Sequence, residues 1–312
     1  MNNGKMIAVW GSGGSGKTTT AVKLAALLAE KKKEVILVLT DIIAPDLSVL
    51  LPFAKDMRSM GHIWALPCNT DTILKSLVTT KSDYIGILGY KNGENVFSHP
   101  DYAKENILDI YTKLKTMADY IIVDCVPEFA YNVLTTVALE LADSVIRLGE
   151  ATTKSFSFFD ANLPLLTDSR YKVEQHIRVL TKVKSNQAKE AALSHYGGVL
   201  VELPFTEELE TQILEGELFT LSSSKGMKNI TNSLDHIIQA VTETPALESQ
   251  LQPKINATKQ GKEKINLKRK SGSADKSRES DGTSNKILKA DKSKHKDEKK
   301  KNPFKLLRKE VS

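Results

Sequence analysis

The stretch that decides the fold is Met6–Thr18, which reads MIAVWGSGGSGKT. Its first part, Met6–Trp10, is a continuous apolar run of the kind that forms a buried strand. The remainder, Gly11–Thr18, matches the phosphate-loop pattern G-x-x-x-x-G-K-[ST], and the amphipathic segment Thr19–Lys31 that follows predicts a helix. Strand, glycine-rich loop and helix in this order predict a nucleoside triphosphate site; a chance glycine-rich turn is the weaker interpretation.

Each residue type in this loop has a physical role. The glycines let backbone N–H groups turn inward around the phosphates, Lys17 reaches the β and γ oxygens, and the Thr18 hydroxyl is a ligand for Mg²⁺. We expect Lys17 to act in catalysis as well as in binding. The loop residues expected to contact the nucleotide are Gly11, Ser12, Gly13, Gly14, Ser15, Gly16, Lys17, Thr18 and Thr19.

Strand-like and helix-like stretches alternate beyond the loop, which predicts an α/β fold with a doubly wound, mostly parallel sheet. Several strand candidates are almost entirely apolar, as in sheets that helices cover on both faces. The expected strands are Met6–Trp10, Val35–Thr40, Ile63–Leu66, Tyr84–Leu88, Tyr120–Asp124, Ser144–Leu148, Ile177–Thr181 and Val199–Glu202. The expected helices are Thr18–Lys31, Asp71–Thr79, Tyr102–Ala118, Ala130–Ala142, Asn186–Ser194 and Ile230–Val241.

The composition changes sharply near Thr244. From Pro245 onward the chain has 20 Lys and Arg against 9 Asp and Glu, whereas residues 1–244 have 24 against 29. We expect residues 1–244 to form a P-loop ATPase domain, 245–301 a disordered Lys-rich linker, and 302–312 a short amphipathic basic helix. The N-terminal residues show no signal-peptide pattern, so a cytoplasmic location is expected.

Two aspartates follow strand candidates and extend the predicted site. Asp124 closes the apolar run Tyr120–Asp124, the Walker B pattern, in which the carboxylate holds the Mg²⁺ shell directly or through water. Asp41 follows the run Val35–Thr40 and is a candidate to orient the attacking water. For Asp41 the alternative is an ordinary turn or helix cap. We therefore predict Thr18 and Asp124 as the Mg²⁺ site, and Lys17, Asp41 and Asp124 as catalytic residues.

The succession of these segments resembles the ParA/MinD superfamily of deviant-Walker ATPases, from residue 4 to about 241. The matching segments are Gly11–Thr19, Val35–Asp41, Asp119–Asp124 and Leu203–Gly216. The resemblance implies a homodimer in the ATP state, and it places Pro204 and Phe205 beside the nucleotide base. Within the superfamily the chain is most similar to the TadZ/CpaE branch, which positions pilus or secretion machinery.

The chain departs from the family pattern at two positions. Ser12 stands where the family has a signature lysine that reaches the phosphates of the partner subunit. Because a cation supplied in trans is worth about 10³–10⁵ in phosphoryl-transfer rate, we expect hydrolysis to be slow, partner-dependent or absent. Leu39 replaces the first aspartate of the family's paired-Asp motif, while Asp41 matches the second.

The expected nucleotide is ATP rather than GTP. The segment Thr181–Lys184 resembles the [NT]-K-x-D guanine-binding motif but ends in lysine. A guanine site requires a carboxylate at that position to accept from the base N1–H and the exocyclic amine. A tyrosine-kinase function is excluded because no tyrosine follows Tyr196.

The C-terminal end has an amphipathic pattern of its own. On a helix, Phe304, Leu307 and Val311 share one face with lysines and an arginine around it, which predicts reversible contact with an anionic membrane. A solvated charged end and a partner-docking motif are the alternatives. The same basic tail would also suit nonspecific DNA.

Three functions remain open on these residues. The first is a nucleotide-switched spatial organiser of pilus or secretion machinery, and the second is a plasmid or mobile-element partition ATPase that acts on DNA. The third is a degenerate scaffold that holds ATP without hydrolysing it.

Overall fold

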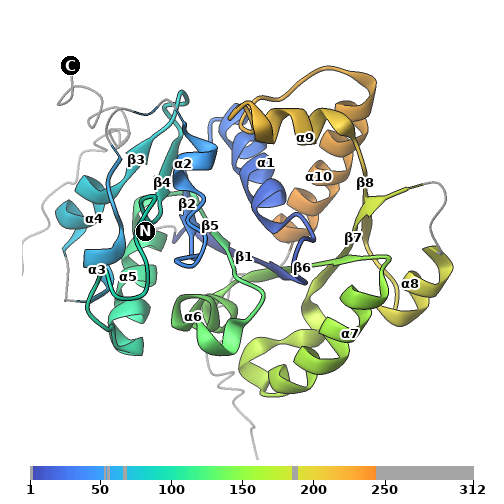
Figure 1. Ribbon diagram of the computed structural model, residues 1–312, viewed down its shortest axis with the longest axis horizontal. Helices are drawn as coiled ribbons and strands as arrows, with labels where there is room; N and C mark the ends of the chain where they lie inside the picture. Colours follow the sequence, from blue (N-terminus) through green and yellow to red (C-terminus); the bar gives the residue numbers. More distant parts are fainter. Residues whose placement is uncertain (1–2, 53, 55–56, 66–68, 185–188, 244–312) are drawn as a thin grey trace, which may run out of the picture. The chain divides into compact units, whose positions relative to one another are not determined.

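An eight-stranded sheet runs through the computed structural model in the order β3-β4-β2-β5-β1-β6-β7-β8 (Figure 1). All neighbouring strands are parallel except β3, which pairs antiparallel with β4 at one edge. The strands are β1 (Lys5–Gly11), β2 (Val35–Leu39), β3 (Val78–Thr79), β4 (Ile85–Leu88), β5 (Tyr120–Asp124), β6 (Ser144–Glu150), β7 (Ile177–Val183) and β8 (Val201–Pro204). This sheet confirms the predicted fold class.

The structure describes residues 3–52, 54, 57–65, 69–184 and 189–243. The predicted linker 245–301 and terminal helix 302–312 lie outside these residues. The α-helices are α1 (Lys17–Glu30), α2 (Leu47–Leu50), α3 (Gly61–Ala65), α4 (Thr70–Ser76), α5 (Lys104–Met117), α6 (Val133–Leu141), α7 (Thr153–Asn162), α8 (Lys189–His195), α9 (Glu207–Leu214) and α10 (Lys225–Glu243). Short 3₁₀ turns cover Phe129–Tyr131, Leu163–Leu166, Ser169–Tyr171 and Val173–Gln175. None of the helices in the described ranges is long and apolar enough to cross a bilayer.

Helices cover both faces of the sheet because β1 is apolar on both of its faces. Met6, Ala8 and Trp10 belong to the hydrophobic cluster under α5, α6 and α7. Ile7 and Val9 belong to the cluster under α1 and α10, on the other face (Figure 1). Side chains alternate between the faces of a strand, so this fully apolar run must lie in the centre of a three-layer fold.

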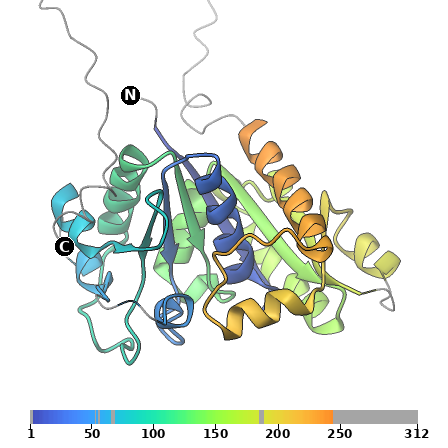
Figure 2. The ribbon, with the colours of Figure 1, turned by 90° about the horizontal axis from the view of Figure 1, so that it is seen from above.

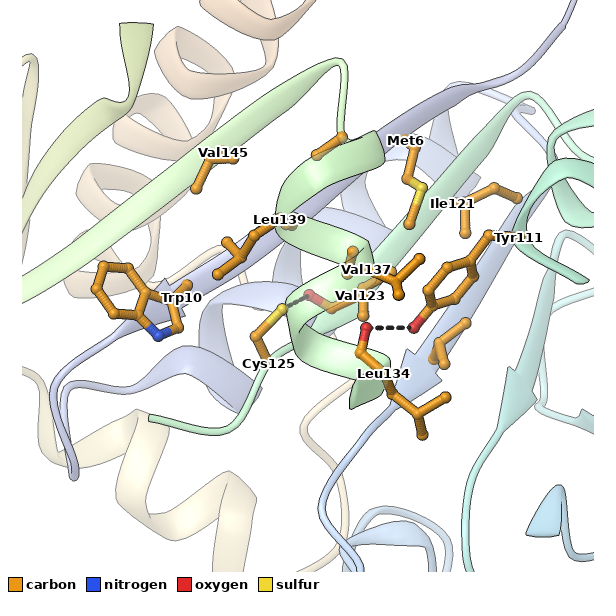
Figure 3. Close-up of a cluster of buried hydrophobic side chains, with 14 of the residues drawn as sticks. Met6, Trp10, Tyr111, Ile121, Val123, Cys125, Leu134, Val137, Leu139 and Val145 are labelled. Carbon is orange, nitrogen blue, oxygen red and sulfur yellow. Dashed lines mark hydrogen bonds between the residues drawn. The ribbon is translucent and has the colours of Figure 1, made fainter. Parts of the chain in front are cut away.

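The cluster beneath α6 shows how tightly that interior is filled (Figure 3). The Tyr111 hydroxyl is fully buried and donates a hydrogen bond of 3.1 Å to the carbonyl oxygen of Leu134. The Cys125 thiol, which follows the end of β5, donates to the carbonyl oxygen of Val123 at 3.6 Å. Each large apolar side chain buried in this way contributes about 1.5–3 kcal/mol. The clusters therefore hold the strand ends, and the loops that follow them, in fixed positions.

One predicted strand is wrong. Ile63–Leu66 was expected in the sheet, but Gly61–Ala65 forms helix α3. The adjacent residues Ile63 and Trp64 are both buried in the same cluster, which a strand cannot achieve because its neighbouring side chains point to opposite faces. The edge strand is instead β3, a two-residue segment inside the predicted helix Asp71–Thr79. Helices α2, α7 and α9 were not among the expected helices; the other strands and helices expected within the described residues are present, with bounds that differ by a few residues.

Candidate functional site

The phosphate loop lies where β1 ends between β5 and β6. Gly14 and Gly16 adopt left-handed backbone angles, with φ of 77° and 78°, and Gly16 caps the start of α1. At Gly11, a Cβ atom would overlap the carbonyl oxygen of Leu148 on the neighbouring strand. A side chain would clash with the neighbouring strand at Gly11, and it would strain the backbone at Gly14 and Gly16. The loop shape depends on the glycines of the predicted motif.

Within the loop, several donors converge on the carbonyl oxygen of Ser12. The Lys17 ammonium donates to it at 3.0 Å, and Ser15 donates from its hydroxyl at 2.8 Å and from its backbone N–H at 3.2 Å. Burial lowers the pKa of Lys17, and the carboxylate of Asp124 acts in the opposite direction. Lys17 is thus held at the start of α1, close to the acidic residues of the site.

Thr18 lies between two carboxylates. Its hydroxyl donates to Oδ2 of Asp124 at 2.7 Å, and Oδ2 of Asp46 lies 3.4 Å away. Asp46, which precedes the short helix α2, was missed from the sequence because it does not follow a predicted strand. Its side chain makes no capping bond, and it is directed to Thr18 instead. Burial, together with the nearby Asp41, raises the pKa of Asp46.

These residues fit a Mg²⁺ ion. Among the described residues, the buried Oδ1 atom of Asp124 has no hydrogen-bond partner. Burial raises the pKa of Asp124 to about 7, which shows how poorly its negative charge is compensated by the protein alone. The described residues contain no cluster of three His, Cys, Asp or Glu that would hold a metal by itself. Mg²⁺ commonly binds through one or two carboxylates together with substrate phosphates, so Thr18, Asp124 and Asp46 would suffice.

The pKa of Asp124 predicts a pH dependence of stability. Folded protein holds this proton up to about pH 7, whereas the unfolded chain releases it near the ordinary value of 3.8. The contribution of Asp124 to the free energy of unfolding is therefore fully present below about pH 4, and it is lost as pH rises through 7. The loss amounts to about 1.4 kcal/mol per pKa unit. In urea unfolding with EDTA and without nucleotide, Asp124→Asn should remove this loss and exceed the wild type in stability at pH 8. An unchanged pH profile in Asp124→Asn would contradict the assignment.

Asp41 has a local role in the loop after β2. Its Oδ1 atom accepts hydrogen bonds from the backbone N–H groups of Ile43 and Ala44, at 2.8 and 3.0 Å. This is the turn-stabilising geometry that was the alternative interpretation. The role of Asp41 in orienting water stays a prediction. Leu39, in contrast, is buried in the cluster beneath α1, so it is a core residue.

The Ser12 side chain points into the protein. Its hydroxyl lies 2.8 Å from the hydroxyl of Ser155 on α7, which in turn lies 2.7 Å from the hydroxyl of Tyr196. The Tyr196 hydroxyl also donates to the carbonyl oxygen of Glu150. Only 3% of Ser12 is exposed. A lysine at this position would have to leave the buried network to reach a second subunit.

On the other side of the loop, a small cavity of about 60 Å³ is lined by Gly16, Thr19, Thr181 and Pro204, among others. Pro204 therefore lies near the start of α1, and its place beside the nucleotide base stays a prediction. The Lys184 ammonium lies 4.3 Å from the centre of the Phe205 ring. The structure thus brings Pro204 to this cavity, but it does not place Phe205 in its lining.

Residues 4–157 match a family model described as AAA domain. Among solved structures, a ParA family ATPase from Chlorobium tepidum has a TM-score of 0.64, with 16% identity over 74% of this chain and 99% of that one. The fold is that of the ParA and MinD ATPases. No curated protein sequence matches the chain.

Two further structures with the ParA/MinD fold contain a nucleotide. The septum site-determining protein MinD from Pyrococcus horikoshii, complexed with Mg-ADP, has a TM-score of 0.60 and 18% identity over 75% of this chain and 95% of that one. A McdA variant from Cyanothece in complex with ATP has a TM-score of 0.58 and 16% identity over 78% of this chain and 98% of that one. These structures share their fold with this chain, and they do not distinguish the TadZ/CpaE branch.

Proposed function

We propose that the protein is an ATP-binding spatial organiser of the ParA/MinD type. The observation that carries this proposal is the group formed by Lys17, Thr18 and Asp124 at the phosphate loop, with an unpaired carboxylate oxygen beside the Thr18 hydroxyl. The Mg-ADP and ATP bound by the two structures above are consistent with ATP and Mg²⁺ as the cofactors here.

The proposed chemistry divides among the residues of the site. The backbone N–H groups of the loop and the start of α1 bind the phosphates, and Lys17 moves from the Ser12 carbonyl to the β and γ oxygens. Thr18, Asp124 and Asp46 would hold Mg²⁺, which neutralises phosphate charge when it is bound. With Ser12 buried, this subunit supplies no lysine in trans at that position, so we expect slow turnover unless a partner stimulates it.

We further propose that ATP promotes a homodimer through the loops at the carboxyl ends of the strands. Exposed apolar side chains occupy the loops after β2, β4 and β5: Ile43 is 88% exposed, Phe97 94% and Tyr131 93%. Large apolar side chains in adjacent loops of this kind are typical of an interaction surface. A second copy placed there would cover them together with the nucleotide.

The finer role remains a choice among three proposals. The first is positioning of pilus or secretion machinery, as in the TadZ/CpaE branch, with peripheral attachment to the inner face of a membrane through Phe304, Leu307, Val311 and the tail lysines. The second is partition of DNA by a tail that binds duplex nonspecifically. The third is a scaffold that binds ATP and never hydrolyses it.

One experiment separates these proposals. ATP turnover by the full-length protein is measured alone, with anionic liposomes and with nonspecific duplex DNA, and each measurement is repeated after deletion of residues 302–312. We expect liposomes to stimulate turnover and the deletion to release the protein from liposomes in sedimentation, since it removes the apolar anchor and its basic neighbours. Stimulation by DNA would favour partition, and tight ATP binding without turnover would favour the scaffold. Undiminished liposome binding by the shortened protein would contradict the terminal anchor.

A further inference from the structure

A cleft of about 730 Å³ opens beside β6 and β7, away from the phosphate loop. Its lining residues Leu166 and Tyr196 belong to the hydrophobic cluster under α5, α6 and α7. Figure 1 shows α7 on the face of the sheet opposite α1 and α10. Three of its lining residues are cations: Arg147 from β6, Arg178 from β7 and Lys172 from the segment between two 3₁₀ turns. None of them takes part in the nucleotide site.

Arg147 is the unusual residue of this cleft. It is only 7% exposed, and no residue in the described part of the chain accepts a hydrogen bond from its guanidinium group. The group lies 5.7 Å from the centre of the Phe159 ring. Burial, together with the neighbouring Arg178, lowers the pKa of Arg147 to about 10, yet the group stays charged at neutral pH. None of its nitrogens is among the fully buried atoms that lack a partner in the described residues, so the guanidinium group opens to the cleft. A cation this shielded from water is costly unless an anion balances it.

The second arginine makes that cost larger. Arg147 and Arg178 are directly paired on the parallel strands β6 and β7, so both side chains leave the same face of the sheet. Like charges in facing positions destabilise a sheet. Arg178 donates from Nη1 to the carbonyl oxygen of Tyr196 at 3.3 Å, which uses one of its five N–H donors. Two guanidinium groups side by side match the oxygens of a phosphate group, which arginine binds in a bidentate manner.

The remaining charges leave the cleft positive. Lys172 lines it from a left-handed backbone conformation with φ of 47°. Two carboxylates also line the cleft, but Asp168 is paired with Arg170 at 3.1 Å, which leaves Glu174 to oppose the three cations. The resulting surplus of about two positive charges corresponds to the charge of a phosphate monoester at neutral pH.

We propose that this cleft is a second anion site, which binds the phosphate group of a small organic ligand between Arg147 and Arg178. The cleft also has an apolar part, formed by Leu163, Leu166 and Val173, that would contact the organic portion of such a ligand. Its volume lies within the range of about 300–1,000 Å³ that is usual for small-molecule sites.

The test is phosphate binding by the full-length protein in a Lys17→Ala background, which weakens binding at the phosphate loop. Inorganic phosphate is titrated calorimetrically at constant ionic strength, with Arg147→Met as the variant. Lys31→Met is the matched control, because Lys31 is 50% exposed, is paired with Asp235 and does not line the cleft. We expect one phosphate per chain, an affinity loss of about tenfold or more in Arg147→Met, and no change in Lys31→Met. Absence of binding, or equal affinities in the two variants, would overturn the proposal.

Two additional measurements address the fold and the ligand class. In phosphate-free buffer Arg147→Met should raise the melting temperature, by about 2–4 °C, because methionine keeps the contact with Phe159 without a buried charge. A lower melting temperature would instead make Arg147 a structural residue and overturn the proposal. Phenyl phosphate should bind more tightly than inorganic phosphate; equal affinity would overturn the assignment of an organic ligand.

Discussion

Replacing Lys17 by alanine should abolish measurable ATP binding by the full-length protein. The Lys17 ammonium is held within the phosphate loop by the Ser12 carbonyl, and in this motif the lysine contacts the β and γ phosphates. Charge-assisted hydrogen bonds contribute about 1.5–3 kcal/mol each, so the loss of two lowers affinity by at least roughly 100-fold. Calorimetry with Mg-ATP measures the affinity, and analytical ultracentrifugation with and without ATP should show that the nucleotide-dependent dimer is lost as well.

A lysine just beyond the end of the same helix gives the matched control. The Lys31 side chain, just after α1, is half exposed, and it pairs with Asp235 at 2.7 Å. Lys31→Ala removes an equal charge, yet it should leave ATP binding unchanged because exposed ion pairs contribute little. If Lys17→Ala bound ATP as tightly as Lys31→Ala does, the assignment of the site would be wrong.

Replacing Asp124 by asparagine should remove the effect of Mg²⁺ on ATP binding. The substitution keeps the shape of the side chain and its contact with Thr18, but it removes the charge that a cation requires. We expect the ratio of ATP affinities with Mg²⁺ and with EDTA to fall by about 10–100-fold, as is usual when a group that orients a metal is lost. Any basal turnover should fall with it.

The same strand supplies the control for this substitution. Asp119 directly precedes β5, at the end of that strand opposite Asp124. Its carboxylate accepts a hydrogen bond from the backbone N–H of Glu34 at 3.0 Å. Asp119→Asn should therefore leave the Mg²⁺ effect intact. An equal loss in both variants would show that the effect of Asp124→Asn comes from the fold rather than from the metal.

The predictable parts of this site are those encoded in short stretches of sequence. The phosphate loop and Asp124 each follow an apolar strand directly, so the ends of two neighbouring parallel strands bring them together. Asp46 depends instead on the path of the chain after β2, which no periodic pattern specifies. The burial of Ser12 against Ser155 likewise requires that α7, a helix missed in the sequence, lies beside the loop.

The fold was predictable to a similar degree, and for the same reason. Strands that bury both faces are long apolar runs, and these were found. Helix α3 and strand β3 are short, and at that length Ile63–Leu66 is compatible with either secondary structure until tertiary packing decides. The burial of Arg147 was not predictable, because a charged residue in a strand suggests exposure. It becomes evident only in the structure, where β6 pairs with β7.

The end of α10 and the phosphate loop lie at opposite ends of strand β1. Lys5, the first residue of β1, donates from its ammonium to the carbonyl oxygens of Val241 and Thr242, so the last described turn of α10 is tied to the start of the sheet (Figure 2). The phosphate loop begins at Gly11, six residues later, which along a strand is about 20 Å away. The chain beyond Glu243 therefore starts from the edge opposite the nucleotide, and a tail bound to a surface would not compete with the second copy of the protein. In such a dimer the two tails would leave from its far ends.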